Sequence, residues 1–233
     1  MDKDYTFLKD YTTRLVEKGK RSSNPGLWNG KMGIAIYLLH FSRVTQVKRY
    51  EKDASELIET LYELISPNLP FAFDNGLLGI GCGFEYIISK GFVDADSDEI
   101  LSEIDLLARN IIDSRSIDNL SFSRGVCGIG FYLYHRLKNR IMEDDNMTVL
   151  KLKEYLIYLI DWIEDLLAKT TDNNDCADAY FLLCRLHKLN VFNYKVDKLA
   201  SFCLQKTIDS NCQMQDNYRL LGLDCLKVLK PWM

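Results

Sequence analysis

A glycine-rich segment that occurs three times constrains the fold of this chain more than any other feature. Each copy reads G-x-x-G-I, followed by alanine or glycine and then an apolar run. The first glycines are separated by 46 residues from Gly30 to Gly76 and by 49 residues from Gly76 to Gly125. Recurrence at a period of about 20–50 residues is typical of repeat folds. The copies span Asn29–Tyr37, Asn75–Gly83 and Arg124–Tyr132.

A fourth copy lacks the glycines but keeps other positions of the motif. Asn174–Leu186 aligns with Gly125–Leu137, so that Cys176 matches Cys127 and an Arg-Leu pair closes both segments. A fifth and weaker copy is Tyr218–Leu229. The chain is therefore interpreted as about five structural repeats.

The segments between the copies have helical spacing. Leu57, Leu61 and Leu64 fall on one face of a helix, and Ile100 and Ile104 do the same in the next segment. No stretch shows the sustained period of two that a strand requires. Each repeat is then long enough for two helices of roughly 14 residues with their connections.

These patterns predict an all-α fold of about ten helices in five pairs, beginning with a helix at about residues 3–19. The motif helices are more apolar, so we expect them on the inside and the amphipathic helices outside. Periodic helix pairs close into an α/α toroid or stack as a solenoid. We predict a single domain over residues 1–233, forming an incomplete α/α toroid.

Composition excludes several classes of protein. The net charge is −4, which argues against a general nucleic-acid binder. The chain contains no run of about 18 apolar residues, and its first ten residues do not resemble a signal peptide. The seven cysteines are scattered without a C-x-x-C pair, which favours reduced thiols. We therefore expect a cytoplasmic protein with no membrane span.

The recurring glycines favour close packing over phosphate binding. Residues three apart share a helix face, so each motif offers a flat patch that a helix or loop can approach. Gly26–Met32 fails as a phosphate-binding loop, because three residues rather than four separate its glycines. Asp94–Glu99 begins like a calcium loop but has Glu99 where that loop needs glycine. A capped helix start accounts for these acids more simply.

The glycine motifs resemble the inner-helix repeat of the lanthionine synthetase C-like (LanC-like) family. The resemblance lies in Leu27–Ala35, Gly76–Gly81 and Gly125–Gly130 and covers about half of the chain, which would be a short and divergent member. It implies an α/α toroid whose inner helices point one end into a central cavity. It also implies peptide modification, in which a zinc-activated cysteine thiol of a peptide adds to a dehydrated Ser or Thr.

The family's zinc ligands are two cysteines and a histidine just before the first glycine of late repeats. Here those positions hold Trp28-Asn29, Asp74-Asn75 and Ser123-Arg124, so we expect no metal cofactor. The weak alternative candidates are Cys127 and Cys176, which occupy one repeat position near helix starts, where a thiolate is favoured. With Asp175, Asp178 or His187 they would form a displaced zinc site. The simpler interpretation is that both are small buried apolar residues.

Polar residues before the inner helices are the candidates for binding a peptide. In the toroid they would lie together around the mouth of the cavity, although Asn and Asp there also serve as helix caps. With Asp178 at the start of the fourth inner helix, the predicted rim consists of Trp28, Asn29, Asp74, Asn75, Arg124 and Asp178.

The leading hypothesis is a LanC-like protein in peptide maturation, acting as a metal-free peptide-binding or accessory member. The first alternative is an active zinc-dependent thioether cyclase with rearranged ligands. A carbohydrate-active α/α toroid would need two carboxylates, for which the inner helices offer Asp74, Glu85 and Asp178. A structural helical-repeat adaptor is the last alternative. The partner is expected to be a peptide or protein, and exposed inner-helix surface would favour a homodimer.

Overall fold

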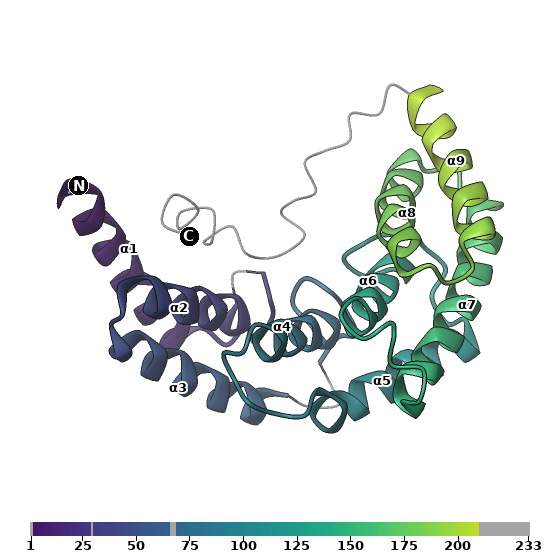
Figure 1. Cartoon of the computed structure of the whole chain (residues 1–233). Helices are drawn as coiled ribbons and strands as arrows, with labels where there is room; N and C mark the ends of the chain where they lie inside the picture. The colour runs from purple at the N-terminus through teal and green to yellow at the C-terminus, as the bar shows by residue number, and fades with distance from the viewer. Residues whose placement is uncertain (1, 29, 66–68, 210–233) are drawn as a thin grey trace. The chain divides into compact units, whose positions relative to one another are not determined.

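The computed structural model describes residues 2–28, 30–65 and 69–209, with the side chains of those between Thr6 and Ile208. Within these ranges the chain forms nine α-helices, one 3-10 helix at His187–Leu189 and no strand. The all-α prediction is confirmed, and the fold is consistent with an α/α toroid. The α-helices are α1 Asp2–Arg21, α2 Lys31–Thr45, α3 Lys48–Leu64, α4 Leu77–Ser89, α5 Ser97–Ser114, α6 Val126–Leu137, α7 Met147–Leu167, α8 Asn173–Leu186 and α9 Asn193–Asp209 (Figure 1).

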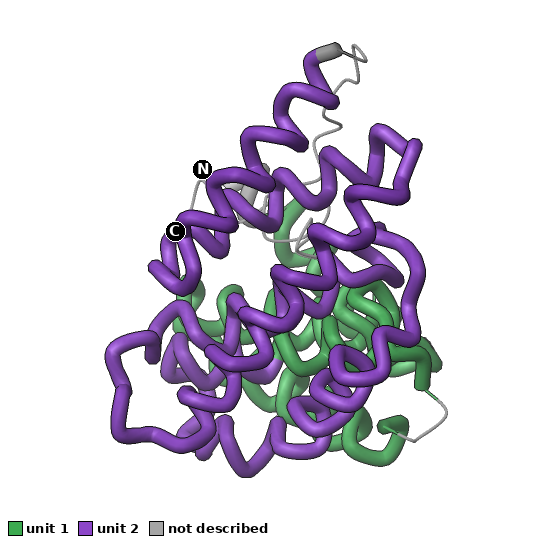
Figure 2. The backbone as a smooth tube through the Cα atoms, turned by 90° about the vertical axis from the view of Figure 1, so that its right-hand side faces the viewer, with its two compact units in different colours: residues 1–83, 218–233 green, residues 84–217 purple. Residues whose placement is uncertain are grey.

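The chain divides into two compact units. Unit 1 consists of residues 1–83 and 218–233, and unit 2 of residues 84–217 (Figure 2). The boundary falls within α4, between Gly83 and Phe84. The prediction of one domain over residues 1–233 stays a prediction. The fifth predicted repeat, Tyr218–Leu229, lies outside the described residues.

Burial separates the motif helices from the helices between them. In α6, 11 of 12 residues are buried, and in α2, 11 of 15. In α5 only 4 of 18 are buried, all on one apolar stripe. The prediction that the glycine motifs begin the more buried helices is therefore confirmed. A helix that is apolar all round is stable only when neighbours cover every face.

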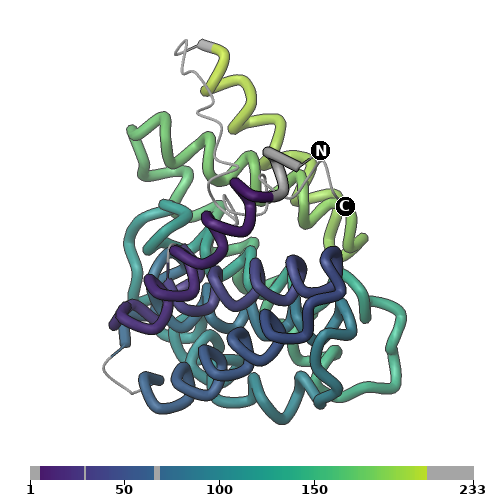
Figure 3. Tube along the Cα trace, turned by 90° about the vertical axis from the view of Figure 1, so that its left-hand side faces the viewer, coloured from purple at the N-terminus to yellow at the C-terminus, as the bar shows by residue number. Residues whose placement is uncertain are grey.

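Neighbouring helices pack within each unit. In unit 1, α2 lies alongside α3, as the view from the N-terminal side shows (Figure 3). In unit 2, α6 packs against α7 and α8, and α8 packs against α9. Among the described residues, no helix combines the length and apolar character that crossing a membrane requires.

Candidate functional site

The three glycine-containing copies begin with the same backbone arrangement. The first amide of each motif helix donates a hydrogen bond to the carbonyl oxygen seven residues upstream. These bonds are Lys31 N to Asn24 O at 2.9 Å, Leu77 N to Pro70 O at 3.0 Å and Val126 N to Asn119 O at 3.1 Å. The first amides of a helix have no partner inside it, so a loop carbonyl satisfies one of them. Each motif therefore fixes a loop against the start of a buried helix.

The first glycine of each motif allows this close approach. A Cβ atom at Gly76 would lie 2.0 Å from the carbonyl oxygen of Pro70. At Gly125 it would lie 2.4 Å from the backbone nitrogen of Ser121. Gly125 is the N-cap of α6, one position before the helix, rather than a residue inside it. The packing interpretation of the glycines is confirmed, and the packing partner is the preceding loop.

In unit 1 the structure brings together three of the predicted rim residues. Trp28 N donates a hydrogen bond to the carbonyl oxygen of Asp74 at 3.0 Å. The Cα of Gly26 lies so close to Asn75 that an added Cβ would be 2.4 Å from the Asn75 Cα. The loop before α2 thus lies directly against the loop before α4. Asn29, the remaining predicted residue here, lies outside the described residues.

Asn75 carries a buried acceptor that the fold does not satisfy. Its backbone N–H donates to Asp74 Oδ1 at 2.8 Å. Its own side-chain oxygen, Oδ1, is shielded from solvent and has no hydrogen-bond partner within the described parts of the chain. Trp28, whose backbone N–H bonds the neighbouring Asp74, has a half-buried side chain. A buried carbonyl oxygen without a donor is unfavourable by about 1–3 kcal/mol, so an N–H group that reached this oxygen would be stabilising.

Unit 2 holds the other two predicted rim residues, Arg124 and Asp178. The Arg124 side chain is exposed at the loop before α6. Asp178, in the second turn of α8, accepts a hydrogen bond from Phe122 N at 2.8 Å. Burial raises the pKa of Asp178 to about 6, although the Phe122 N–H partly opposes this shift. Asp178 therefore connects the loop of the third repeat to the helix of the fourth.

Cys127 and Cys176 lie in surroundings that favour the neutral thiol. Cys127 is fully buried, and burial raises the pKa of its thiol well above the ordinary value, with a further contribution from the charge of Asp178. Burial also raises the pKa of Cys176. The burial of both side chains outweighs the effect of the helix N-terminus. Both cysteines therefore behave as small core residues.

The donor set does not fit zinc. The described residues contain no group of three or more His, Cys, Asp or Glu side chains that could hold a metal ion. His187, which was considered with the two cysteines, is instead 2.7 Å from Asp197 through its Nδ1. A structural zinc site needs four ligands and a catalytic site three. No catalytic step through zinc follows from these residues.

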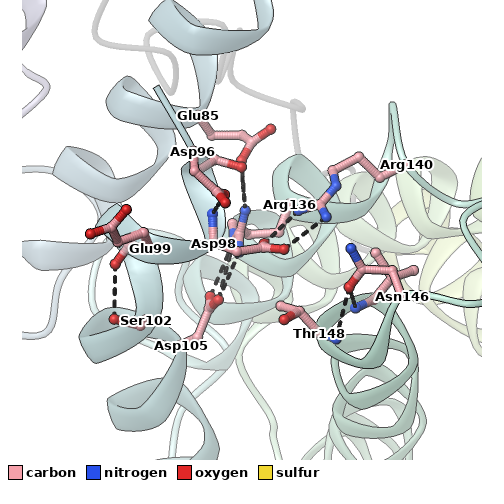
Figure 4. Close-up of polar contacts among 12 residues, drawn as sticks. Glu85, Asp96, Asp98, Glu99, Ser102, Asp105, Arg136, Arg140, Asn146 and Thr148 are labelled. Carbon is pink, nitrogen blue, oxygen red and sulfur yellow. Dashed lines mark hydrogen bonds and ion pairs between the residues drawn. The ribbon is translucent and has the colours of Figure 1, made fainter. Parts of the chain in front are cut away.

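A polar cluster that the sequence did not reveal surrounds Arg136 in α6. The arginine is fully buried and connects α6 to α4 and α5 (Figure 4). Tyr132, one turn earlier in α6, donates to Asp105 Oδ1 at 2.5 Å. Arg136 itself donates to Glu85 at 2.8 Å, Ser97 at 3.1 Å, Asp98 at 2.7 Å and Asp105 at 2.8 Å.

Charge pairing determines the protonation states in this arginine cluster. Arg140 donates to both Asp98 oxygens, at 2.5 and 2.9 Å. These bonds, with those from Arg136, lower the pKa of Asp98 to about 2 against a smaller effect of burial. Burial alone would lower the pKa of Arg136, but its bonds to Asp105 raise it above the ordinary value. Asp98 and Arg136 are therefore charged at neutral pH.

The arginine cluster also bears on the carbohydrate-active alternative. Glu85, one of the three acids that this alternative could use, is buried and forms an ion pair with Arg136. A carboxylate that is already ion-paired with a buried arginine is not free to act as the acid or base of sugar hydrolysis. The calcium-like segment is a helix start as predicted, since Asp96 caps α5 by accepting from Asp98 N at 2.8 Å. The additional role of Asp98 in the arginine cluster was missed.

Comparison with known proteins agrees with this architecture. A model of one protein family, described as lanthionine synthetase C-like protein, matches residues 21–182. The matched region contains all three glycine motifs and most of the fourth copy, and it covers more than two thirds of the chain. No curated protein matches the sequence. The chain therefore belongs to the lanthionine synthetase C-like protein family, which suggests a role in peptide modification.

Proposed function

We propose that this LanC-like chain binds a peptide at the loops that precede its motif helices, as a metal-independent binding or accessory member of a peptide-modifying system. The observation that carries the proposal is the Oδ1 of Asn75, which has no partner among the described residues and follows Asp74, the residue that accepts the backbone hydrogen bond of the half-buried Trp28. A peptide backbone supplies N–H donors, and its side chains pack against an indole ring. Tryptophan and arginine are the residue types that dominate binding energy at interfaces, and Arg124 is exposed in unit 2.

The residues present support a role without zinc. The positions before the glycines hold Trp, Asn, Asp, Ser and Arg, of which Asp74 alone is a usual zinc ligand. Cys127 and Cys176 are buried, and burial raises the pKa of both thiols, so neither is held ready as a thiolate. The chain's own contribution is then to hold and orient a peptide on which another protein acts.

Selection from a random-peptide phage library, followed by calorimetry of the enriched peptides, tests the binding site. We expect Trp28→Ala and Asn75→Ala to weaken binding of the selected peptides by about tenfold each, the equivalent of about 1.4 kcal/mol. Tyr194→Ala is the matched control, because Tyr194 is an aromatic side chain of α9 with 86% exposure and does not precede a motif helix. Equal weakening by all three substitutions, or peptides that bind all variants alike, would contradict the proposal.

Elemental analysis of purified protein separates this proposal from the active cyclase. We expect no stoichiometric zinc in the wild type, in Cys127→Ala or in Cys176→Ala. About one zinc per chain that is lost in both variants would replace the proposal with a zinc-dependent thioether cyclase with rearranged ligands.

We further propose that the chain forms a homodimer. The last described helix, α9, exposes Phe202 and Ile208, with 42% and 61% of their surface accessible. Exposed apolar side chains on one helix favour association with a second copy. Light scattering at several protein concentrations tests this, and a mass of one chain at every concentration would contradict it.

A further inference from the structure

A pocket in unit 2 lies at the end of α6 opposite to the glycine motif. Its volume is about 390 Å³, within the range of about 300–1,000 Å³ that is common for small-molecule sites. It is bounded by the C-terminal half of α4, the first residue of α5 and the residues that directly follow α6. The polar residues that matter to its chemistry are Glu85, Lys90, Ser97, Lys138, Asn139 and Arg140.

This pocket concentrates positive charge, although the chain as a whole has a net charge of −4. Its lining contains three cations, Lys90, Lys138 and Arg140, against one carboxylate. That carboxylate, Glu85, is already paired with the buried Arg136. A second pocket of about 200 Å³ has a balanced lining, with Arg109 and Lys151 against two aspartates. A third, of about 290 Å³, has two cations against three aspartates.

Lys138 is held in position by a buried histidine. Its Nζ lies 3.0 Å from Nδ1 of His135. Burial lowers the pKa of His135 to about 3, so the imidazole is neutral at physiological pH. An ammonium group has donors but no acceptor, so Nδ1 must be the acceptor of this bond. The ammonium charge at the pocket is therefore oriented rather than free to rotate on its stem.

Ser97 and Arg140 contribute in different ways. Arg136 donates to Ser97 Oγ at 3.1 Å, which leaves the serine's own proton for a further acceptor. Ser97 is also the first residue of α5, where the helix dipole is positive. Arg140 donates to Asp98 and Glu143, which compensate its charge, so the net positive charge of the pocket comes from Lys90 and Lys138. Asn139 is exposed at the pocket and carries an amide that donates.

We propose that this pocket binds a phosphoryl group, either free phosphate or the phosphate of a small ester. A phosphate carries a charge close to −2 at neutral pH and several acceptor oxygens, which match two lysines with neutral donors beside them. Lysine binds phosphate as a point charge without demanding the paired geometry of arginine. The site is separate from the Arg124 loop, because it lies at the other end of α6.

A purely structural role for the lysines makes a different prediction. Lys138 is the C-cap of α6, and Lys90 directly follows α4. Cations at helix C-termini stabilise the helix dipole by about 0.3–1 kcal/mol. That role lowers stability when the lysines are removed, but it gives no saturable binding of phosphate.

Calorimetric titration of the full chain distinguishes the two roles. The ligands are inorganic phosphate, glycerol 2-phosphate and citrate, at constant ionic strength and neutral pH. We expect saturable binding of one phosphate or ester per chain and no such binding of citrate. Lys90→Met and Lys138→Met should each weaken it by about tenfold, the value of one hydrogen bond to a charged group. Tighter binding of the ester than of phosphate would identify an organic phosphate as the ligand, and equal binding would identify free phosphate.

Lys151→Met is the matched control, because Lys151 is an exposed lysine at the pocket of balanced charge. It should leave phosphate binding unchanged. A second measurement needs no variant: phosphate should protect Lys90 and Lys138, but not Lys151, from reductive methylation followed by mass spectrometry. Absence of saturable binding, equal affinity for citrate, or equal weakening by Lys151→Met would overturn the proposal.

Discussion

The third and fourth repeats place equivalent arginines in opposite surroundings. Both motif helices end in an Arg-Leu pair, Arg136-Leu137 in α6 and Arg185-Leu186 in α8. Arg136 is fully buried among three carboxylates. Arg185 is partly exposed and lies over the ring of Phe181, 4.4 Å from its centroid. A repeat position thus fixes where an arginine lies on its helix, while the neighbouring helices fix what it does.

The starts of the same two helices differ as well. α6 begins after Gly125, where the loop backbone approaches too closely for any side chain. α8 begins after Asp172, whose side chain accepts a hydrogen bond from Asn174 N at 2.8 Å. The glycine start depends on a tight loop, and the aspartate start replaces that loop with a local side-chain cap. The loss of glycine in the fourth copy is therefore compensated chemically.

The largest expected effect separates the two arginines. Arg136→Met should reduce the free energy of unfolding by about 3–5 kcal/mol, because it leaves buried carboxylates without a counter-charge. Arg185→Met should reduce the free energy of unfolding by about 0.5–1 kcal/mol, which is the contribution of an exposed cation–π contact. Urea unfolding of both variants measures the difference, and Glu85→Gln added to Arg136→Met should recover part of the loss. An equal loss of unfolding free energy in the two variants would show that the surroundings of these arginines do not affect stability.

The next effect concerns the tight loop. Gly125→Ala should cost about 1–3 kcal/mol, because the new Cβ meets Ser121 backbone atoms that cannot move independently. Gly130→Ala is the control within the same helix. There the new atom meets the ends of the Leu182 and Leu159 side chains, and alanine gains about 1 kcal/mol of helix propensity. A smaller loss of stability at Gly125 than at Gly130 in urea unfolding would refute the backbone explanation.

The third effect is that two aspartates make the stability of the fold depend on pH in opposite directions. The folded pKa of Asp98 is about 2, below its ordinary value of 3.8, so its contribution is present above pH 3.8 and is lost toward pH 2. The folded pKa of Asp178 is about 6, above the same ordinary value, so stability falls as the pH rises from 3.8 through 6.

Substitution by asparagine isolates each dependence. Asp178→Asn keeps an acceptor for Phe122 N and should flatten the decline between about pH 4 and 6. Asp98→Asn should flatten the loss between about pH 4 and 2. The measurement is the free energy of unfolding across a pH series, with the wild type at each point. If the free energy of unfolding of Asp178→Asn follows that of the wild type from pH 4 to 6, the titration of Asp178 is not the cause of the decline.

The smallest effect tests the cap of the fourth repeat. Asp172→Ala should reduce stability by about 1 kcal/mol, as expected for loss of an N-cap side chain. Asp145→Ala removes the same charge from an exposed turn and should change stability by less than about 0.5 kcal/mol. A loss at Asp172 no larger than at Asp145 in thermal unfolding would show that the cap is not needed.

Much of the fold was readable from local patterns. Glycine spacing identified the motif helices, because a close backbone approach leaves no space for another residue type. Apolar periodicity separated the buried helices from the amphipathic ones, since a helix buried on one face has an apolar stripe and a helix buried on all faces is apolar all round. The capping role of the acids around Asp96 was also predictable, because a cap needs only residues near it in the chain.

The candidate sites depended on contacts between distant segments. Glu85 and Arg136 are 51 residues apart, and no spacing rule joins an acid in one repeat to an arginine in the next. The pKa values of Cys127 and Asp178 reflect how completely neighbouring helices exclude water, which overrides the local effect of a helix start. The sequence alone determined the repeat, the helices and the family, because these rest on local geometry. Only the tertiary structure decided which charges meet and which thiols are buried, because those depend on packing between helices.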